Sequence, residues 1–163
     1  DWSSDVCSSD LGIADSLGNL GSLVAQTGDL ARAAQLDGEA LEIRRELGDS
    51  ISIAYGLESI GGTTARAGRY VDAMRLFGAG NHLREEIAVP LPPSEQENFE
   101  SGTGLCRDAL SPEAYTAAWE EGRAMPLPDA IAAEATATFR RSTKNGAERF
   151  MWSCRMKLQE PCF

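Results

Sequence analysis

The sequence has very few of the residues on which catalysis and metal binding depend. It contains one histidine, His82, and four scattered cysteines. One histidine cannot form the pair of ligands that many metal sites use, and four cysteines are too few for a disulfide scaffold. Apart from His82 no residue is a plausible base for a serine nucleophile, and the chain has no GxxxxGK[ST] loop for phosphates. We therefore expect no catalytic activity, no metal site and no cofactor.

Basic residues and long apolar runs are also scarce. The formal net charge is −10, from 25 acidic and 15 basic residues. Because nucleic-acid binding requires a positive surface, this balance excludes it for the bulk of the chain. No apolar run approaches the roughly 18 residues of a membrane span, and no basic and apolar signal segment opens the chain. The sequence predicts a cytoplasmic protein whose partners are neither nucleic acids nor membranes.

β-branched residues are sparse while alanine and glycine are abundant, which favours helices over strands. Two segments repeat each other 40 residues apart, with Leu17 matching Leu57. The apolar residues in each segment recur at spacings of three and four, as on one face of a helix. Gly28 and Asp29 interrupt this pattern, because glycine suits the end of a helix and aspartate the N-cap of the next. Residues 12–88 are therefore predicted to form two hairpins of antiparallel helices.

A glycine recurs in the middle of the first helix of each segment, at Gly21 and Gly61. Glycine at such a position costs about 1 kcal/mol relative to alanine, so its recurrence indicates that another helix crosses closely. We predict that the second helix of the same hairpin crosses at this point, with Ala33 and Ala73 on the other side of the contact. A large side chain at either glycine would force the two helices apart.

The two segments share a pattern of large and small residues that resembles the tetratricopeptide repeat. The matching residues are Leu17, Leu20, Gly21 and Ala33 in the first segment, and Leu57, Ile60, Gly61, Ala73 and Phe77 in the second. The sequence departs from the family at Asp37, where the family has an aromatic residue, and in its period of 40 rather than about 34 residues. The resemblance implies an all-α solenoid of antiparallel helical hairpins. The alternative is another kind of array of helical hairpins.

The resemblance also implies that the first helices of the hairpins line the concave side of the stack. Polar side chains on that side can bond an extended or helical peptide. The candidate groove residues are Asp15, Asn19, Ser22, Gln26, Tyr55, Glu58 and Arg66. The alternative is that these residues form an ordinary solvated helix face.

A proline-rich segment, Pro90–Pro93, ends the second hairpin, because proline lacks a backbone donor. Ser94 and Glu97 then form a capping-box pattern, which predicts the start of a helix. Ser111, followed by proline, predicts the start of the next helix. We expect residues 94–139 to be helices that cap the C-terminal end of the stack. The aromatic residues expected to be buried against the second hairpin are Phe99, Tyr115 and Trp119.

Residues 12–138 resemble the repeat region of large actinobacterial regulators of the LuxR type, which carry a signal-transduction ATPase module. The stretch Tyr115–Met125 is among the residues that carry this resemblance. It implies a protein-interaction or signal-sensing module, cut from a multidomain transcription regulator, whose partner is a protein, a peptide or a neighbouring domain. The alternatives are the repeat region of a nucleotide cyclase or protein kinase, and a structural spacer. No helix-turn-helix pattern follows Phe139, so DNA binding is not implied.

The two ends of the chain differ from the rest. Residues 1–11 have no apolar period and resemble the conceptual translation of a sequencing adapter, fused to a metagenomic gene fragment. We expect them to be a non-native, disordered leader; the alternative is a genuine disordered N-terminus. Residues 140–163 hold both lysines of the chain, with six basic against two acidic residues. This change predicts a basic tail or a segment translated out of frame.

Overall fold

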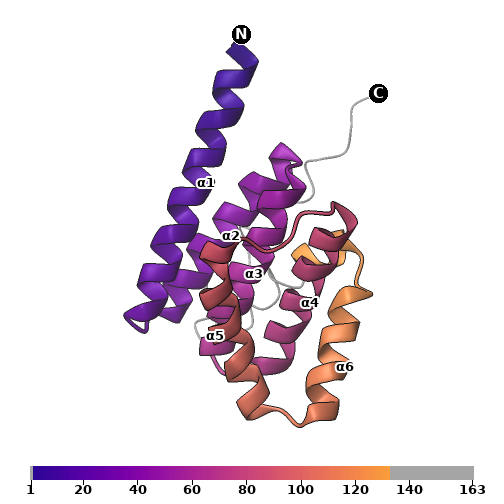
Figure 1. Ribbon diagram of the computed structural model, residues 1–163. Helices are drawn as coiled ribbons and strands as arrows, with labels where there is room; N and C mark the ends of the chain where they lie inside the picture. Colours follow the sequence, from indigo (N-terminus) through magenta and orange to yellow (C-terminus); the bar gives the residue numbers. More distant parts are fainter. Residues whose placement is uncertain (1, 133–163) are drawn as a thin grey trace, which may run out of the picture.

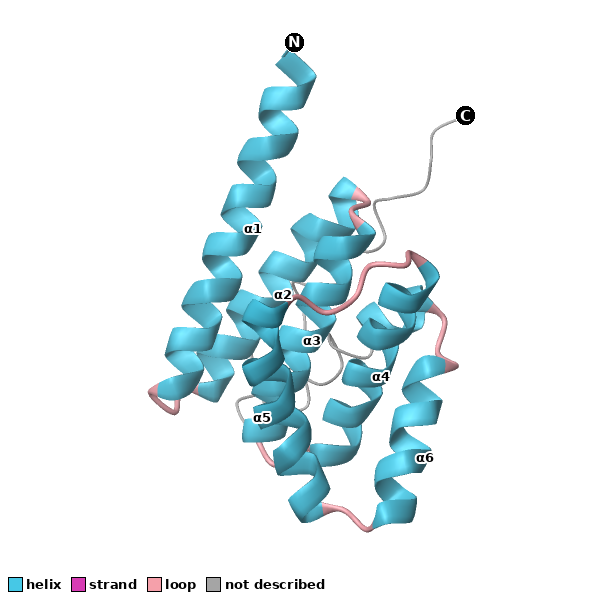
Figure 2. Cartoon of the chain, in the orientation of Figure 1, coloured by secondary structure: helices cyan, strands magenta, loops and turns pink. Residues whose placement is uncertain are grey.

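In the computed structural model, which describes residues 2–132, all regular structure is α-helical (Figures 1 and 2). The helices are α1 (Trp2–Gln26), α2 (Leu30–Leu47), α3 (Ser50–Arg66), α4 (Tyr70–Glu86), α5 (Pro93–Ala109) and α6 (Pro112–Arg123). A further helical stretch begins at Leu127 and reaches the last described residue, Ala132. The predicted all-α, tetratricopeptide-like helical repeat is confirmed. None of the described helices is long and apolar enough to cross a membrane.

The first four helices form two hairpins, because α1 packs mainly on α2 and α3 mainly on α4. The contact between α2 and α3 joins the hairpins. The turns follow the sequence prediction: Gly28 has a φ of 89°, and Asp29 caps α2 by accepting a 3.1 Å hydrogen bond from the backbone N–H of Arg32. Asp49 caps α3 in the same way, accepting from the N–H of Ile51 at 3.1 Å. Glycine suits this turn because L side chains are strained at positive φ.

The mid-helix glycines lie where the helices of each hairpin cross, as predicted. A Cβ atom added to Gly21 would lie 2.6 Å from Oδ1 of Asp37 and 3.4 Å from the carbonyl oxygen of Ala33. A Cβ added to Gly61 would lie 3.2 Å from the ring of Phe77, rather than against the predicted alanine. The glycine therefore makes room for the side chain that lies 16 residues further along the chain.

The helices after the second hairpin do not form a third hairpin of the same kind. Helix α5 packs on α3 and α4 whereas α6 packs on α4, and α5 and α6 meet each other through side chains such as Phe99 and Trp119. The backbones of α4 and α6 come very close, because a Cβ on Gly122 would collide with the carbonyl group of Arg75, and one on Gly78 with that of Trp119. Two glycines on facing helices thus allow α6 to lie directly on α4.

Two expectations about local structure need correction. Helix α5 starts one residue before the predicted Ser94, with Pro92 at the N-cap and no side-chain cap bond, so the predicted capping box is not formed. Residues 2–11 belong to α1 rather than to a disordered leader, and α1 projects beyond the other helices at this end (Figure 1). Once a helix is nucleated, each further residue adds one backbone hydrogen bond, so α1 can extend without an amphipathic face. The predicted non-native origin of residues 1–11 stays a prediction.

The apolar core has two parts. One is built mainly by α3 and α4, where it includes Leu57 and Leu83, and is joined by Leu41 of α2 and by Ala130 of the last helical stretch. The other surrounds Phe77 where α4, α5 and α6 meet, and the side chains of Phe99, Tyr115 and Trp119 pack against it while staying partly exposed. The role of residues 94–139 as a cap stays a prediction, since its last part and the basic tail, 140–163, lie outside the described residues.

Candidate peptide-binding groove

A groove lies between the first helices of the two hairpins and α5. Its lining residues are Ser22, Gln26, Tyr55, Glu58, Ser59, Gly62, Arg66, Leu91, Glu95, Asn98 and Phe99. The structure thus brings together five of the seven predicted groove residues. Asp15 and Asn19 lie elsewhere on α1 and do not line it. The residues from α5 and the loop before it were missed, because no periodicity relates this helix to the two hairpins.

Glu58 forms part of the floor of the groove as one half of a buried ion pair. Its carboxylate accepts two hydrogen bonds from Arg84 of α4, at 2.6 Å from Nε and 2.8 Å from Nη2. Burial raises the pKa of Glu58, the bonds to Arg84 oppose that rise, and the nearby carboxylate of Glu95 adds to it. A carboxylate held on both oxygens is already satisfied, so Glu58 shapes the floor rather than offering a free charge.

Tyr55 is held in place by a second buried arginine. Arg44 of α2 is 1% exposed, and its guanidinium carbon lies 5.0 Å from the centroid of the Tyr55 ring. Nη2 of Arg44 donates to a carboxylate oxygen of Asp15 at 3.0 Å and to the carbonyl oxygen of Ala14 at 3.2 Å. Asp15 therefore anchors Arg44 instead of facing the groove. Arg44 and Arg84 are 40 residues apart and so occupy equivalent positions of the repeat, and both are buried.

A third buried charge lies beneath the groove, at Asp37. Its carboxyl group accepts hydrogen bonds from the hydroxyl groups of Thr63, at 2.8 Å, and of Ser59, at 3.4 Å. Burial raises the pKa of Asp37 from its ordinary value of 3.8 to about 6, and the two hydroxyl groups and the positive charges of Arg44 and Arg66 limit the rise. In the sequence, Asp37 stands out only as a departure from the repeat pattern.

The rim of the groove differs from its floor, because its polar side chains have no partner. Within the described residues, the side chains of Gln26, Arg66, Glu95 and Asn98 make no hydrogen bond or ion pair. Arg66 is exposed at the C-terminal end of α3. Glu95 lies near the middle of α3, since its charge raises the pKa values of both Tyr55 and Glu58, for which burial is the first cause. The rim offers a cation, an anion and two amides to a ligand.

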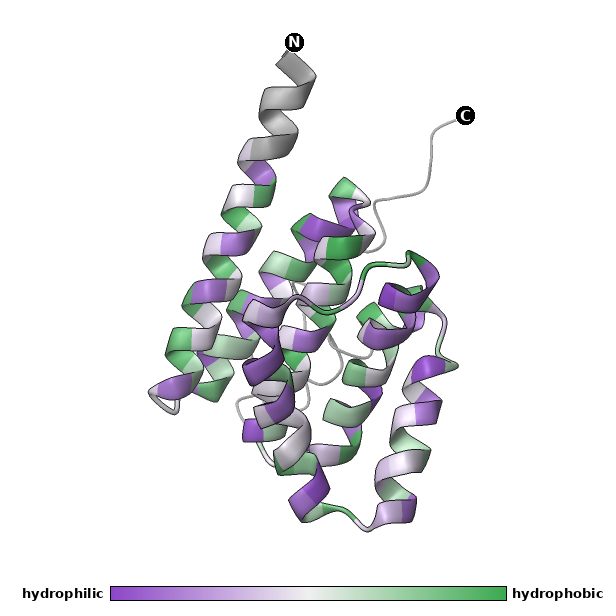
Figure 3. Cartoon of the chain, viewed as in Figure 1, coloured by the Kyte–Doolittle hydropathy of each residue, from purple (hydrophilic) through white to green (hydrophobic). Residues whose placement is uncertain are grey.

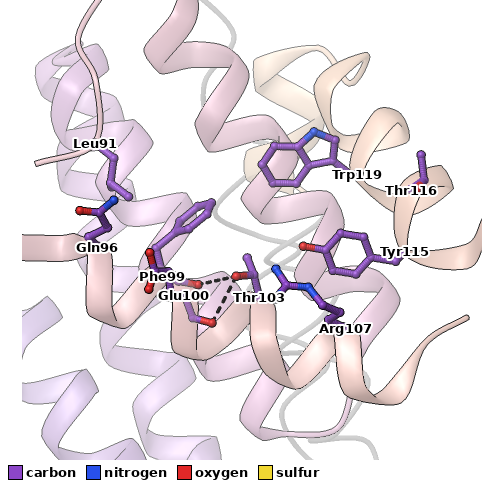
Figure 4. Close-up of a pocket in the computed structure, with 9 residues that line it drawn as sticks. All are labelled: Leu91, Gln96, Phe99, Glu100, Thr103, Arg107, Tyr115, Thr116 and Trp119. Atoms are coloured by element: carbon purple, nitrogen blue, oxygen red, sulfur yellow. Dashed lines mark hydrogen bonds between the residues drawn. The ribbon is translucent and has the colours of Figure 1, made fainter. Parts of the chain in front are cut away.

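A second hollow, the aromatic cleft, lies between α5 and α6 and has a volume of about 380 Å³ (Figure 4). It is lined by Leu91, Gln96, Phe99, Glu100, Thr103, Arg107, Tyr115, Thr116 and Trp119. The rings of Phe99 and Trp119 meet edge to face at 6.4 Å, and the guanidinium of Arg107 lies 5.8 Å from the centre of the Tyr115 ring. Leu91 and Phe99 line both hollows, so the groove and the cleft adjoin.

Cys106, which lies beside this cleft in the second part of the core, is not a reactive thiol. It is fully buried on α5. Burial raises the pKa of the thiol to about 11, so the reactive thiolate is rare at neutral pH. Cys106 is therefore a packing residue of the core.

Residues 13–48, which span the second half of α1 and all of α2, match the sequence profile of a tetratricopeptide repeat. No curated protein and no solved structure matches the chain. The matched segment is the first hairpin, and the second hairpin repeats its glycine contact and its turns. The chain is therefore similar to helical-repeat modules of this type, which commonly mediate interactions between proteins.

Proposed function

We propose that this chain is a non-enzymatic interaction module that binds an extended peptide of a partner protein in the groove. The observation that carries the proposal is the contrast between floor and rim. The side chains of Tyr55 and Glu58 are held by buried arginines, while Arg66, Glu95 and the two amides of the rim are unpaired. A rigid floor with unsatisfied polar groups around it binds a ligand without losing much conformational entropy.

The two rim charges specify the kind of peptide. The guanidinium of Arg66 reaches back to Gly62, because its Nη1 lies 3.5 Å from a Cβ added to that glycine. Gly62 is one turn from Glu58 on α3, about 6 Å along the helix axis. Glu95 lines the same groove and acts on Glu58 and Tyr55, so we place its charge about one helix turn from that of Arg66. An extended chain covers about 3.3 Å per residue. The groove therefore suits a peptide with an acidic side chain for Arg66 and a basic one for Glu95, about two residues apart.

The finer identity of the protein is part of the same proposal. The resemblance of residues 12–138 to LuxR-type regulators supports a module that senses a protein signal in the cytoplasm and passes it to neighbouring domains of a transcription regulator. The repeat region of a cyclase or kinase, and a structural spacer, are the competing identities. Peptide binding by this chain can be measured whichever of these three identities is correct.

A fluorescent peptide library tests the proposal, with acidic and basic residues placed one to six positions apart in an otherwise neutral extended sequence. We expect binding to peak near a spacing of two. Arg66→Glu should weaken the best peptide about tenfold, and a peptide with lysine at the acidic position should restore binding. Arg32→Glu is the matched control, because Arg32 is exposed on α2 away from the groove. Equal losses in the two variants, or no binding by any peptide, would refute the groove.

A further inference from the structure

Helix α1, the first helix of the stack, carries several apolar residues (Figure 3), and three large ones form an exposed stripe. Ile13 is 49% exposed, Leu20 46% and Leu23 59%. Their spacings of seven and three residues place them on one face of the helix. These three make up half of the exposed large apolar residues among the described part of the chain. An apolar stripe of this kind marks an interaction surface more often than an ordinary surface.

The second hairpin shows how the same face is covered. The residues 40 positions further on are Ile53, Ile60 and Thr63 of α3, and they are 4%, 3% and 4% exposed. They are covered by α2: Thr63 donates its hydroxyl hydrogen to Asp37, and the two isoleucines share a cluster with Leu41. The stripe thus lies on the face of α1 that is equivalent to the buried face of α3. In α3 this face packs against the preceding helix, α2.

The contacts of α2 define the chemistry of a helix that would cover α1. In that covering helix, the residue at the position of Leu41 would lie between Ile13 and Leu20. The residue at the position of Asp37 would face Leu23 instead of a threonine hydroxyl, so that residue must be apolar. The equivalent of Arg44, which in α2 lies over Tyr55, would meet Asp15. One carboxylate oxygen of Asp15, Oδ1, already accepts from this chain's own Arg44, but the side chain is 57% exposed and Oδ2 can accept from a second arginine. The pattern is two apolar residues four apart, followed by an arginine three residues later.

Charge disfavours a second copy of this chain as the occupant. The residues of α1 from Asp10 onward include two aspartates and no basic residue, so two α1 helices repel each other. The other terminal helix, α6, exposes small and acidic residues that cannot cover an apolar stripe: Thr116, Ala117, Glu120 and Glu121. A helix with basic residues beside its apolar face is complementary to α1 in both respects.

We propose that the stripe on α1 is a docking surface for an amphipathic helix of a partner protein, which presents two large apolar side chains four residues apart and an arginine three residues further. The stripe lies outside the groove, so the surface is additional to the proposed peptide site and does not depend on it. The helix docks as α2 docks on α3, with its apolar side chains over Ile13, Leu20 and Leu23 and its arginine on Asp15.

The probe is a fluorescent peptide with the sequence of residues 29–48, carrying Asp37→Leu so that an apolar residue faces Leu23. We expect the intact chain to bind it. Leu20→Ser and Leu23→Ser should each weaken binding at least about tenfold, the loss expected for one large apolar side chain. Leu105→Ser is the matched control, because Leu105 is 40% exposed on α5, away from the stripe, and it should bind like the parent. A peptide with the further change Arg44→Glu should also bind at least about tenfold more weakly.

Three results would overturn the proposal. The first is the absence of binding to the parent chain. The second is an affinity that Leu20→Ser and Leu23→Ser leave unchanged, which would mean that the peptide displaces the protein's own α2, since both leucines are exposed in the presence of α2. The third is a dimer of the parent in sedimentation that Leu20→Ser converts to a monomer, because the occupant would then be a second copy. Circular dichroism of each variant verifies that it is folded.

Discussion

The carboxyl group of Asp37 occupies in the first hairpin the place that the ring of Phe77 occupies in the second. Each lies against a mid-helix glycine, with the added Cβ 2.6 Å from Asp37 and 3.2 Å from Phe77. The aspartate puts a titratable group between the hairpins, where it is 2% exposed and bonded to Thr63 and Ser59 of α3. We therefore expect the contact between the hairpins to depend on pH.

The pH dependence of stability should be weaker in Asp37→Asn. The pKa of Asp37 is raised from 3.8 to about 6, mainly by burial, so the folded chain binds more protons than the unfolded chain between these values. The contribution of Asp37 to the free energy of unfolding is therefore fully present below about pH 4. It is lost as the pH rises to about 6. The shift corresponds to at most about 3 kcal/mol. In urea melts from pH 4 to 7, the parent should lose stability relative to Asp37→Asn by an amount of this order.

The matched control for this experiment is Asp108→Asn, because Asp108 is exposed on α5. The stability of Asp108→Asn in urea melts should change with pH in the same way as that of the parent. A constant difference between the parent and Asp37→Asn would show that Asp37 is ionised throughout.

Gly122→Ala should destabilise the chain by about 1–3 kcal/mol, as is typical when a closely packed site is overfilled. The added methyl group collides with the backbone of Arg75, which cannot rotate away as a side chain can. Gly104→Ala is the matched control, because a Cβ there meets nothing within 4 Å. The control should stabilise α5 by up to about 1 kcal/mol. Thermal melts of the two variants that shift in the same direction would contradict the close contact of α4 and α6.

Arg84→Met should cost about 3–5 kcal/mol in the free energy of unfolding, because it leaves the carboxylate of Glu58 buried without its partner. The double variant Glu58→Leu/Arg84→Met should recover most of that loss, since it removes both charges. Arg45→Ala, which breaks the exposed pair with Glu42, should cost less than about 1 kcal/mol. Urea melts measure all three, and a double variant as unstable as Arg84→Met would show that the pair itself is stabilising.

Trp119→Ala should cost about 2 kcal/mol, roughly half the typical value for a fully buried aromatic residue. Trp119 was expected to be buried, but the structure leaves it partly exposed at the edge of the aromatic cleft, with its ring against Phe99. Thr116→Ala, on the same wall of the cleft, should change stability by less than about 0.5 kcal/mol. Urea midpoints distinguish the two, and equal midpoints for Trp119→Ala and the parent would exclude any role in packing.

The hairpins could be predicted from sequence because their signals are local. The spacing of apolar residues and the Gly-Asp turns each act within a few residues, and the repeat of 40 residues doubles the evidence. The position of α6 could not be predicted in this way. Its contact with α4 joins Gly78 to Trp119 and Arg75 to Gly122, pairs that no repeat or periodicity connects.

The groove was predicted in part for the same reason. The candidates on α1 and α3 followed from the repeat, and five of the seven lie together. The buried arginines could not be recognised, because an arginine within a helix is expected to be exposed until a partner for its charge is known. Arg44 and Arg84 find those partners on other helices, at Asp15 and Glu58.

The pairing of helices has a consequence for how the chain folds and comes apart. Among α1 to α6, every extensive contact joins neighbours in the chain or helices separated by just one other helix. Such short loops lose little entropy on closing, so each hairpin can form before the next and the contact order is low. A force applied to the two ends should remove the helices in sequence rather than break the whole fold at once, as in other stacked repeats. The junction at Asp37 should then yield at lower force at neutral pH than in mild acid.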